Sequence, residues 1–212
     1  MMERSPAISK ELRLYHVAVG NPRETLNTLV ELIAALQSED RSMSMVICVS
    51  SRDQLDEVFV ALYTQLTEVG RVNVWCLHAD LGEREILTCA NQFRDVSRYD
   101  IPGSSSTGEN EQQQYPLNIL VTTDAPLQTL LKMNCDPLCP TLMIHYNLPK
   151  RREEYSRRNG VILGSRKSGT EGTRRIGLCF VEAGKLEELH QFEEFAERTL
   201  REMPVHVKDI LV

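Results

Sequence analysis

The sequence lacks the features of a membrane, secreted or strongly basic protein. None of its apolar runs approaches the ~18 consecutive residues of a membrane-spanning helix, and residues 1–10 contain no apolar signal core. The net charge is −6, so any contact with nucleic acid would need a local basic patch. We therefore expect a soluble, intracellular protein of the cytoplasm or nucleus, with an organelle matrix left open.

The sequence also has no cysteine pattern typical of a metal site or a disulfide framework. Cys48, Cys76 and Cys179 lie in apolar runs, where a free cysteine is usually a small buried hydrophobe. Cys135 and Cys139 have a short spacing that zinc sites use, but no second Cys or His pair follows. We expect reduced thiols, no metal and no other cofactor.

No Ser-His-Asp or Cys-His arrangement stands at a recognisable spacing. His145 lies inside an apolar run, so we interpret it as a core histidine whose ring nitrogens are satisfied rather than as a catalytic residue.

Short apolar runs alternate with helical periodicity along the chain. Strands are predicted at 12–19, 43–49, 72–77, 117–122, 141–146 and 176–181, with amphipathic helices between them and a final helix over 186–201. This order predicts an α/β fold, a doubly wound and mostly parallel sheet flanked by helices.

The domain organisation predicted is a flexible segment at 1–11 followed by one domain over 12–212. A chain of 212 residues can bury roughly 70% of its unfolded surface in a single domain. The stretch 101–115 is polar, rich in Gly, Ser and Gln, and has no apolar period. It cannot bury enough surface to offset its ordering entropy, which predicts a disordered loop.

Several short motifs then follow one another in a familiar order. They are Met45–Arg52 (MVICVSSR), Leu77–Leu81 (LHADL), Gln92–Arg94 (QFR), Asn118–Asp124 (NILVTTD) and Leu142–Pro149 (LMIHYNLP). Together they resemble the C-terminal RecA-like lobe of DEAD-box RNA helicases over nearly the whole chain. The tail at 201–211 resembles that of the translation initiation factor 4A type. The resemblance implies a RecA-like fold and, in an intact two-lobed enzyme, ATP-dependent RNA helicase activity.

Several motifs of this family are degenerate here. The sequence contains no Gly-x-x-x-x-Gly-Lys-Ser/Thr P-loop, since Gly184-Lys185 lacks both the first glycine and the hydroxyl residue. Where motif V of the family has arginine, glycine and aspartate, this chain has Gln128, Thr129 and Leu131. Motif IVa is similarly altered at residues 83–86.

Motif VI has lost the residues that the family uses at the γ-phosphate. Arg158 and Gly160 remain as vestigial positions, whereas the two later arginines are replaced by Val161 and Gly164. Arginines in this role contribute about 10³ to 10⁵ in rate in related nucleotidases. We therefore predict neither ATP binding nor hydrolysis, with Arg166 left as one residue that could take over a lost position.

The resemblance also implies positions that could contact an RNA backbone. Their side chains carry hydroxyl, imidazole, carboxylate or basic groups at strand ends, and they are Ser51, Arg52, His78, Asp80, Thr122 and Thr123. The alternative for Ser51 and Thr123 is that they only cap the helices that follow. RNA contact, if retained, is expected to be weak and salt-sensitive.

A basic cluster follows the strand at 141–146 and continues before the strand at 176–181. As a candidate partner-binding patch it comprises Arg151, Arg152, Arg157, Arg158, Arg174 and Arg175. One interpretation is a solvated helix face balanced by Glu153 and Glu154. The other is a docking surface for an acidic protein segment or for RNA.

These observations favour a catalytically inactive helicase-like lobe that serves as an adaptor in an RNA-related assembly. The resemblance implies a protein partner, with a helical-repeat scaffold as one candidate, and RNA bound weakly if at all. The alternative is the C-terminal lobe of an active RNA helicase whose P-loop lobe is supplied elsewhere. A small-molecule-binding α/β domain is a third possibility, which the lack of a Gly-rich turn after the first strand disfavours.

Overall fold

The computed structural model describes residues 12–37, 42–66, 72–98, 117–164 and 175–211. The flexible segment predicted at 1–11 and the loop predicted at 101–115 lie outside these residues, so both stay predictions. No helix in the described part of the chain is long and apolar enough to cross a membrane.

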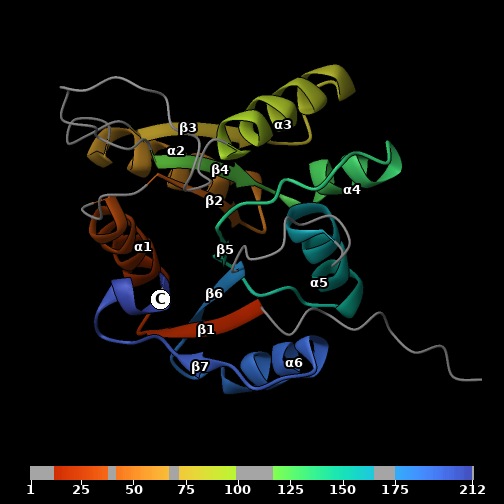
Figure 1. Cartoon of the computed structure of the whole chain (residues 1–212). Coiled ribbons are helices and arrows are strands. Elements are labelled where there is room, and N and C mark those ends of the chain that lie inside the picture. The colour runs from red at the N-terminus through yellow and green to blue at the C-terminus, as the bar shows by residue number, and fades with distance from the viewer. Residues whose placement is uncertain (1–11, 38–41, 67–71, 99–116, 165–174, 212) are drawn as a thin grey trace, which may run out of the picture.

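A single sheet runs through the centre of the domain, in the strand order β3-β4-β2-β5-β6-β1-β7 (Figure 1). The strands are β1 Leu12–Val19, β2 Met43–Cys48, β3 Val72–Leu77, β4 Leu117–Thr122, β5 Leu142–His145, β6 Arg175–Glu182 and β7 Arg201–Glu202. Each pairing between them is parallel. The predicted doubly wound, mostly parallel sheet is confirmed.

Helices cover both faces of this sheet, which is why its central strands read as continuous apolar runs. The helices are α1 Pro22–Gln37, α2 Arg52–Leu66, α3 Glu83–Arg98, α4 Asp124–Lys132, α5 Arg152–Arg158 and α6 Leu186–Ala196. A π-helix at Asn159–Leu163 continues α5, and a 3₁₀ helix spans Val207–Leu211. One core joins α1, α2 and the 3₁₀ helix to the sheet, and a second core joins α3 to α6 to the opposite face (Figure 1).

The end of the chain differs from the prediction. The helix expected over 186–201 ends at Ala196, because Glu197 adopts a left-handed conformation with φ of 54°. A left-handed residue stops the helical hydrogen-bond ladder and turns the chain. Arg201–Glu202 then pairs with Tyr15 and His16 of β1, adding a short seventh strand that the sequence did not predict.

Candidate functional site

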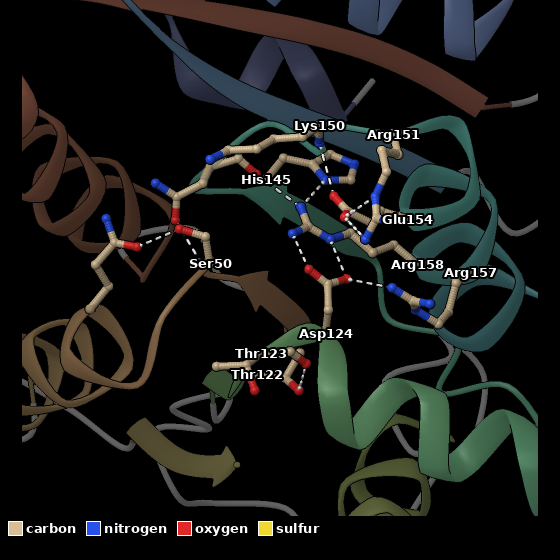
Figure 2. Close-up of polar contacts among 12 residues, drawn as sticks. Ser50, Thr122, Thr123, Asp124, His145, Lys150, Arg151, Glu154, Arg157 and Arg158 are labelled. Atoms are coloured by element: carbon tan, nitrogen blue, oxygen red, sulfur yellow. Dashed lines mark hydrogen bonds and ion pairs between the residues drawn. The ribbon is translucent and has the colours of Figure 1, made fainter. Parts of the chain in front are cut away.

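A buried ion pair joins the ends of two helices at the carboxyl edge of the sheet. Asp124 begins α4 directly after β4, and Arg158 ends α5. Arg158 donates from Nε to Asp124 Oδ1 at 2.9 Å and from Nη2 to Asp124 Oδ2 at 2.6 Å (Figure 2). Its Nη1 donates to the backbone oxygen of Asn147 at 2.8 Å. This bidentate geometry is the strongest form of an ion pair.

Arg158 is shielded from solvent, with its side chain only 2% exposed, whereas the Asp124 side chain is 24% exposed. Burial alone would lower the pKa of the Arg158 guanidinium, but the hydrogen bond to Asp124 and the negative charges of Asp124 and Glu154 together raise that pKa above its ordinary value. Arg158 therefore stays charged. A buried charge of this kind depends on its partner remaining in place.

His145 lies behind Arg158 and is fully buried. Its Nδ1 is 3.2 Å from Arg158 Nη1. Burial lowers the pKa of His145 well below its ordinary value, and the neighbouring positive charge lowers it further. The ring is therefore neutral and Nδ1 accepts the hydrogen bond. Nε2 has no hydrogen-bond partner among the described residues, so the predicted satisfaction of both nitrogens holds for Nδ1 only.

A groove of about 700 Å³ opens beside the ion pair at this edge of the sheet. Its lining comes from the end of β6 and from the segments that follow β1, β2, β4, β5 and β6, as expected where the carboxyl ends of parallel strands meet. Apolar lining comes from Pro22, Leu148 and the mostly buried Tyr146 and Phe180. The charged lining residues are Asp124, Lys150, Arg151, Glu154, Arg157, Arg158, Glu182, Lys185 and Glu188.

The segment that stands in the place of motif VI does not present positive charge to this groove. Asn159–Leu163 winds into the π-helix, and Val161 is buried in the second core. Gly164 has φ of +73°, and a Cβ built there would lie 2.5 Å from Cγ of Pro137. A side chain at 164 would therefore be strained both by the backbone conformation and by contact with Pro137.

The loop between α4 and β5 holds this segment in the core. Its amides donate to the π-helix, from Leu138 to the Val161 oxygen at 3.0 Å and from Cys139 to the Ile162 oxygen at 2.8 Å. Leu138 itself is fully buried. The contact of this loop with the segment after α5 depends on tertiary structure, and the sequence analysis missed it.

Arg94 of α3 also holds the loop between α4 and β5 in place. Its Nε donates to the backbone oxygen of Pro137 at 3.1 Å, and its Nη2 donates to that of Asp136 at 2.7 Å. The loop carbonyls are thus satisfied by a guanidinium rather than by water. Arg94, the loop and the π-helix form one connected unit.

Three of the predicted RNA-contacting residues lie together where β2 and β3 end. Arg52 Nη1 is 3.1 Å from Asp80 Oδ2, and His78 Nδ1 is 3.5 Å from the same oxygen. Arg52 also pairs with Asp56 at 3.0 Å. Two carboxylates therefore offset the one guanidinium, which limits its attraction for a phosphate.

The three hydroxyl residues on the same list differ from one another. Ser51 caps α2, because its Oγ accepts the backbone N–H of Gln54 at 3.2 Å. Thr123 precedes α4 without a capping side-chain bond. Thr122 is fully buried and donates to the oxygen of Thr123 at 3.0 Å, so its hydroxyl is withheld from an external ligand.

The predicted basic patch is divided by ion pairs instead of forming one surface. Arg151 pairs with Glu154 at 2.9 Å, and Arg152 pairs with Glu197 at 3.1 Å on the side of α6. Arg158 is the buried residue of the central pair, and Arg175 donates to the Gly164 oxygen at 3.3 Å. Arg157 lies beside the groove, while Arg174 falls outside the described residues.

The chain is 26% identical over 200 residues to eukaryotic initiation factor 4A of Drosophila melanogaster, covering 94% of this chain and 40% of that protein. No protein-family model matches the chain. The chain thus spans well under half the length of this relative.

Solved structures agree on the fold. The C-terminal domain of the DEAD-box protein Dbp5 superimposes with a TM-score of 0.61 at 16% identity, covering 95% of this chain and 94% of that domain. The E. coli DEAD-box protein SrmB bound to regulator of ribonuclease activity A gives 0.60 at 15% identity, covering 96% and 95%. The predicted resemblance is confirmed: the chain is related to initiation factor 4A and has the fold of a DEAD-box C-terminal, RecA-like lobe.

Proposed function

We propose that the chain is a catalytically inactive DEAD-box-type lobe that works as a protein-interaction adaptor in an RNA-related assembly. One observation carries the inactivity. Val161, at a position where the family resemblance expects an arginine, is packed in the core with only 7% of its surface exposed. The second such position, Gly164, abuts Pro137 in a left-handed conformation.

The chemistry that follows is the loss of charge stabilisation at a transferring phosphoryl group. An apolar side chain in the core and a glycine supply no positive charge to such a group. Gln128 and Leu131 likewise replace the ionisable residues that motif V would provide. Charged motif residues are thus replaced by neutral residues, one of which packs in the core. This supports a lobe whose role depends on its fold and not on catalysis.

Relatives and structural neighbours support the adaptor part. The SrmB structure contains a protein partner, regulator of ribonuclease activity A. Direct RNA contact would be weak, because Asp56 and Asp80 neutralise Arg52. Ser51, His78 and Thr123 remain candidate RNA contacts beside Arg52 and Asp80, whereas the burial of Thr122 removes it from the set.

Reconstitution of ATP turnover tests the inactivity. The N-terminal lobe of Drosophila initiation factor 4A would be mixed with this chain and with RNA, and phosphate release would be measured. The C-terminal lobe of the same factor is the positive control. We expect no release above that of the N-terminal lobe alone, and stimulation by this chain would overturn the proposal.

Crosslinking mass spectrometry in native extract tests the adaptor role separately. Crosslinks to translation or RNA-processing components are expected. Crosslinks confined to metabolic enzymes would refute an RNA-related role.

A second candidate is the C-terminal lobe of a working RNA helicase whose P-loop lobe is supplied elsewhere. It is favoured by the intact RecA-like fold, by the ordered Asp124–Arg158 pair and by the coverage of only 40% of the Drosophila relative. The reconstitution above distinguishes the two candidates, since only this second one predicts stimulated turnover.

A further inference from the structure

Most of the charged side chains lining the groove already have a partner of opposite sign. The ion pairs within the lining are Arg158–Asp124 at 2.6 Å, Arg151–Glu154 at 2.9 Å and Lys185–Glu182 at 3.0 Å. Paired in this way, these six groups contribute little net charge to the groove.

Lys150 and Arg157 are the two lining cations outside these three ion pairs. Lys150 is exposed, and its ammonium makes no ion pair with another described residue. Arg157 is only 19% exposed, and its contact with Asp124 Oδ1 is 4.0 Å long. That oxygen already accepts a hydrogen bond from Arg158 Nε at 2.9 Å. Arg157 Nε is buried and finds no hydrogen-bond partner in the part of the chain that the structure describes.

The two leftover cations flank the central pair in Figure 2, with Lys150 above it and Arg157 to one side. Against them stands one lining carboxylate that is not paired within the described residues, that of the exposed Glu188. Arg157 lines the groove and its ion-pair contact with Asp124 is 4.0 Å long, so its charge is only weakly compensated within the described residues. The groove is therefore short of negative charge beside Arg157.

The chemistry of the lining selects among anions. Lys150 and Arg157 lie on different sides of the central pair, so two carboxylates spaced along a chain can meet them separately, whereas a phosphate group brings its charges to one point (Figure 2). Pro22 and Leu148 add accessible apolar surface to the same groove. An acidic residue followed by an apolar one matches both features.

We propose that this groove docks an acidic segment of a protein partner, with a carboxylate of that segment paired to Arg157 and a second attracted by Lys150. The proposal rests on the adaptor function above and names its surface and the chemistry of its partner. Apolar side chains of the segment pack near Pro22 and Leu148. Arg152, outside the groove and already paired to Glu197, takes no part.

Peptide binding to the full chain tests this directly. The probe is a fluorescein-labelled peptide of glutamate, leucine and alanine, and its match has every glutamate changed to glutamine. Fluorescence polarisation is measured with the natural chain, with Lys150→Gln, Arg157→Gln and the double variant, and with Arg201→Gln as control. Arg201 is exposed on β7 and lies outside the groove.

We expect the double variant to lose about tenfold or more in affinity for the acidic peptide, as for a pair of complementary charges. Arg201→Gln should bind like the natural chain, and the glutamine peptide should not distinguish any variant. Arg157→Lys should retain part of the affinity, and circular dichroism should show the natural fold for each variant.

Three outcomes overturn the docking proposal. The natural chain could fail to bind the acidic peptide, the double variant could bind it as well as the natural chain does, or inorganic phosphate or single-stranded RNA could bind more tightly in a Lys150- and Arg157-dependent manner. None of these bears on ATP turnover, which the reconstitution measures. Failure of the docking surface is thus distinct from failure of the proposed function.

Discussion

The end of α5 keeps a charged residue in a buried position, whereas the π-helix that follows it has an apolar one. Arg158 is buried and keeps a bidentate ion pair with Asp124. Val161, less than one turn later, sits in an apolar core. The comparison shows that a charged residue persists here where its partner and its hydrogen bonds are supplied within the lobe.

The physical reason is what remains in the lobe when each of these residues is lost. Removing one member of a buried ion pair strands the other charge, which is strongly destabilising. An arginine whose partner is an external phosphate strands nothing within the lobe when it is lost, and its place can be filled by packing. The loop at 134–140 and Arg94 provide that packing.

Returning an arginine to position 161 should have the largest effect. Val161→Arg would force a charge into the second core and should cost more than about 4 kcal/mol of unfolding free energy. The matched control is Gly160→Arg, because a Cβ at the neighbouring Gly160 meets nothing within 4 Å. Urea denaturation of both variants measures the difference, and equal stability would show that position 161 is not a core position.

Breaking the retained ion pair should come next. Asp124→Ala leaves Arg158 buried without its carboxylate and should destabilise the fold by about 3–5 kcal/mol. Arg152→Ala removes the exposed pair with Glu197 and should cost less than about 1 kcal/mol. If the two variants unfolded at the same urea concentration, the pair would have no structural role.

Releasing the loop should have an intermediate effect. Arg94→Ala removes the donors to the carbonyls of Asp136 and Pro137 and should cost about 1–3 kcal/mol. Arg84→Ala, an exposed arginine on the same helix, is the control. Thermal unfolding measures the stability of both variants. Hydrogen exchange at the Leu138 and Cys139 amides should be faster in Arg94→Ala alone.

Acidification should have the smallest effect on stability, and it should act through His145, which contacts Arg158 of the ion pair. Because the folded state lowers the pKa of His145, the unfolded chain binds more protons below pH ~6.5, and stability falls as the pH drops through that value. The slope contributed by this residue is at most about 1.4 kcal/mol per pH unit.

His145→Gln keeps an acceptor for Arg158 and should flatten this dependence in urea titrations between pH 7 and pH 5. The matched control is His190→Gln, at a histidine whose side chain is 65% exposed. An unchanged slope in His145→Gln would assign the acid sensitivity to other groups.

Local pattern was enough to predict the strands and the parallel sheet. The strands at 72–77 and 117–122 match the structure to the residue, because each is a short apolar run bounded by polar residues. The final helix was overextended because the left-handed Glu197 has no local signal, as glycine would have had. The π-helix depends on the loop at 134–140, which periodicity does not report.

The candidate site was less accessible to sequence reasoning. Arg158 was predicted as a vestigial motif position and as a member of the basic patch, yet it anchors the site together with Asp124, 34 residues earlier. The signal was available in part, because a carboxylate after one strand and a base after another meet at the same edge of a parallel sheet. That Lys150 has no ion pair within the described residues, and that the contact of Arg157 with Asp124 is 4.0 Å long, required side-chain geometry.

The pairing of β1 with β6 also sets the order in which the protein can assemble during synthesis. Leu12 pairs beside Arg175, and Val19 beside Glu182, so the first strand has no neighbour for most of its length until β6 leaves the ribosome. At about 5–20 residues per second, the nascent chain spends on the order of ten seconds or more with that edge unsatisfied. Contacts so distant in sequence also slow folding. A chaperone that shields β1 during translation would therefore raise the yield of folded protein more than one acting after release.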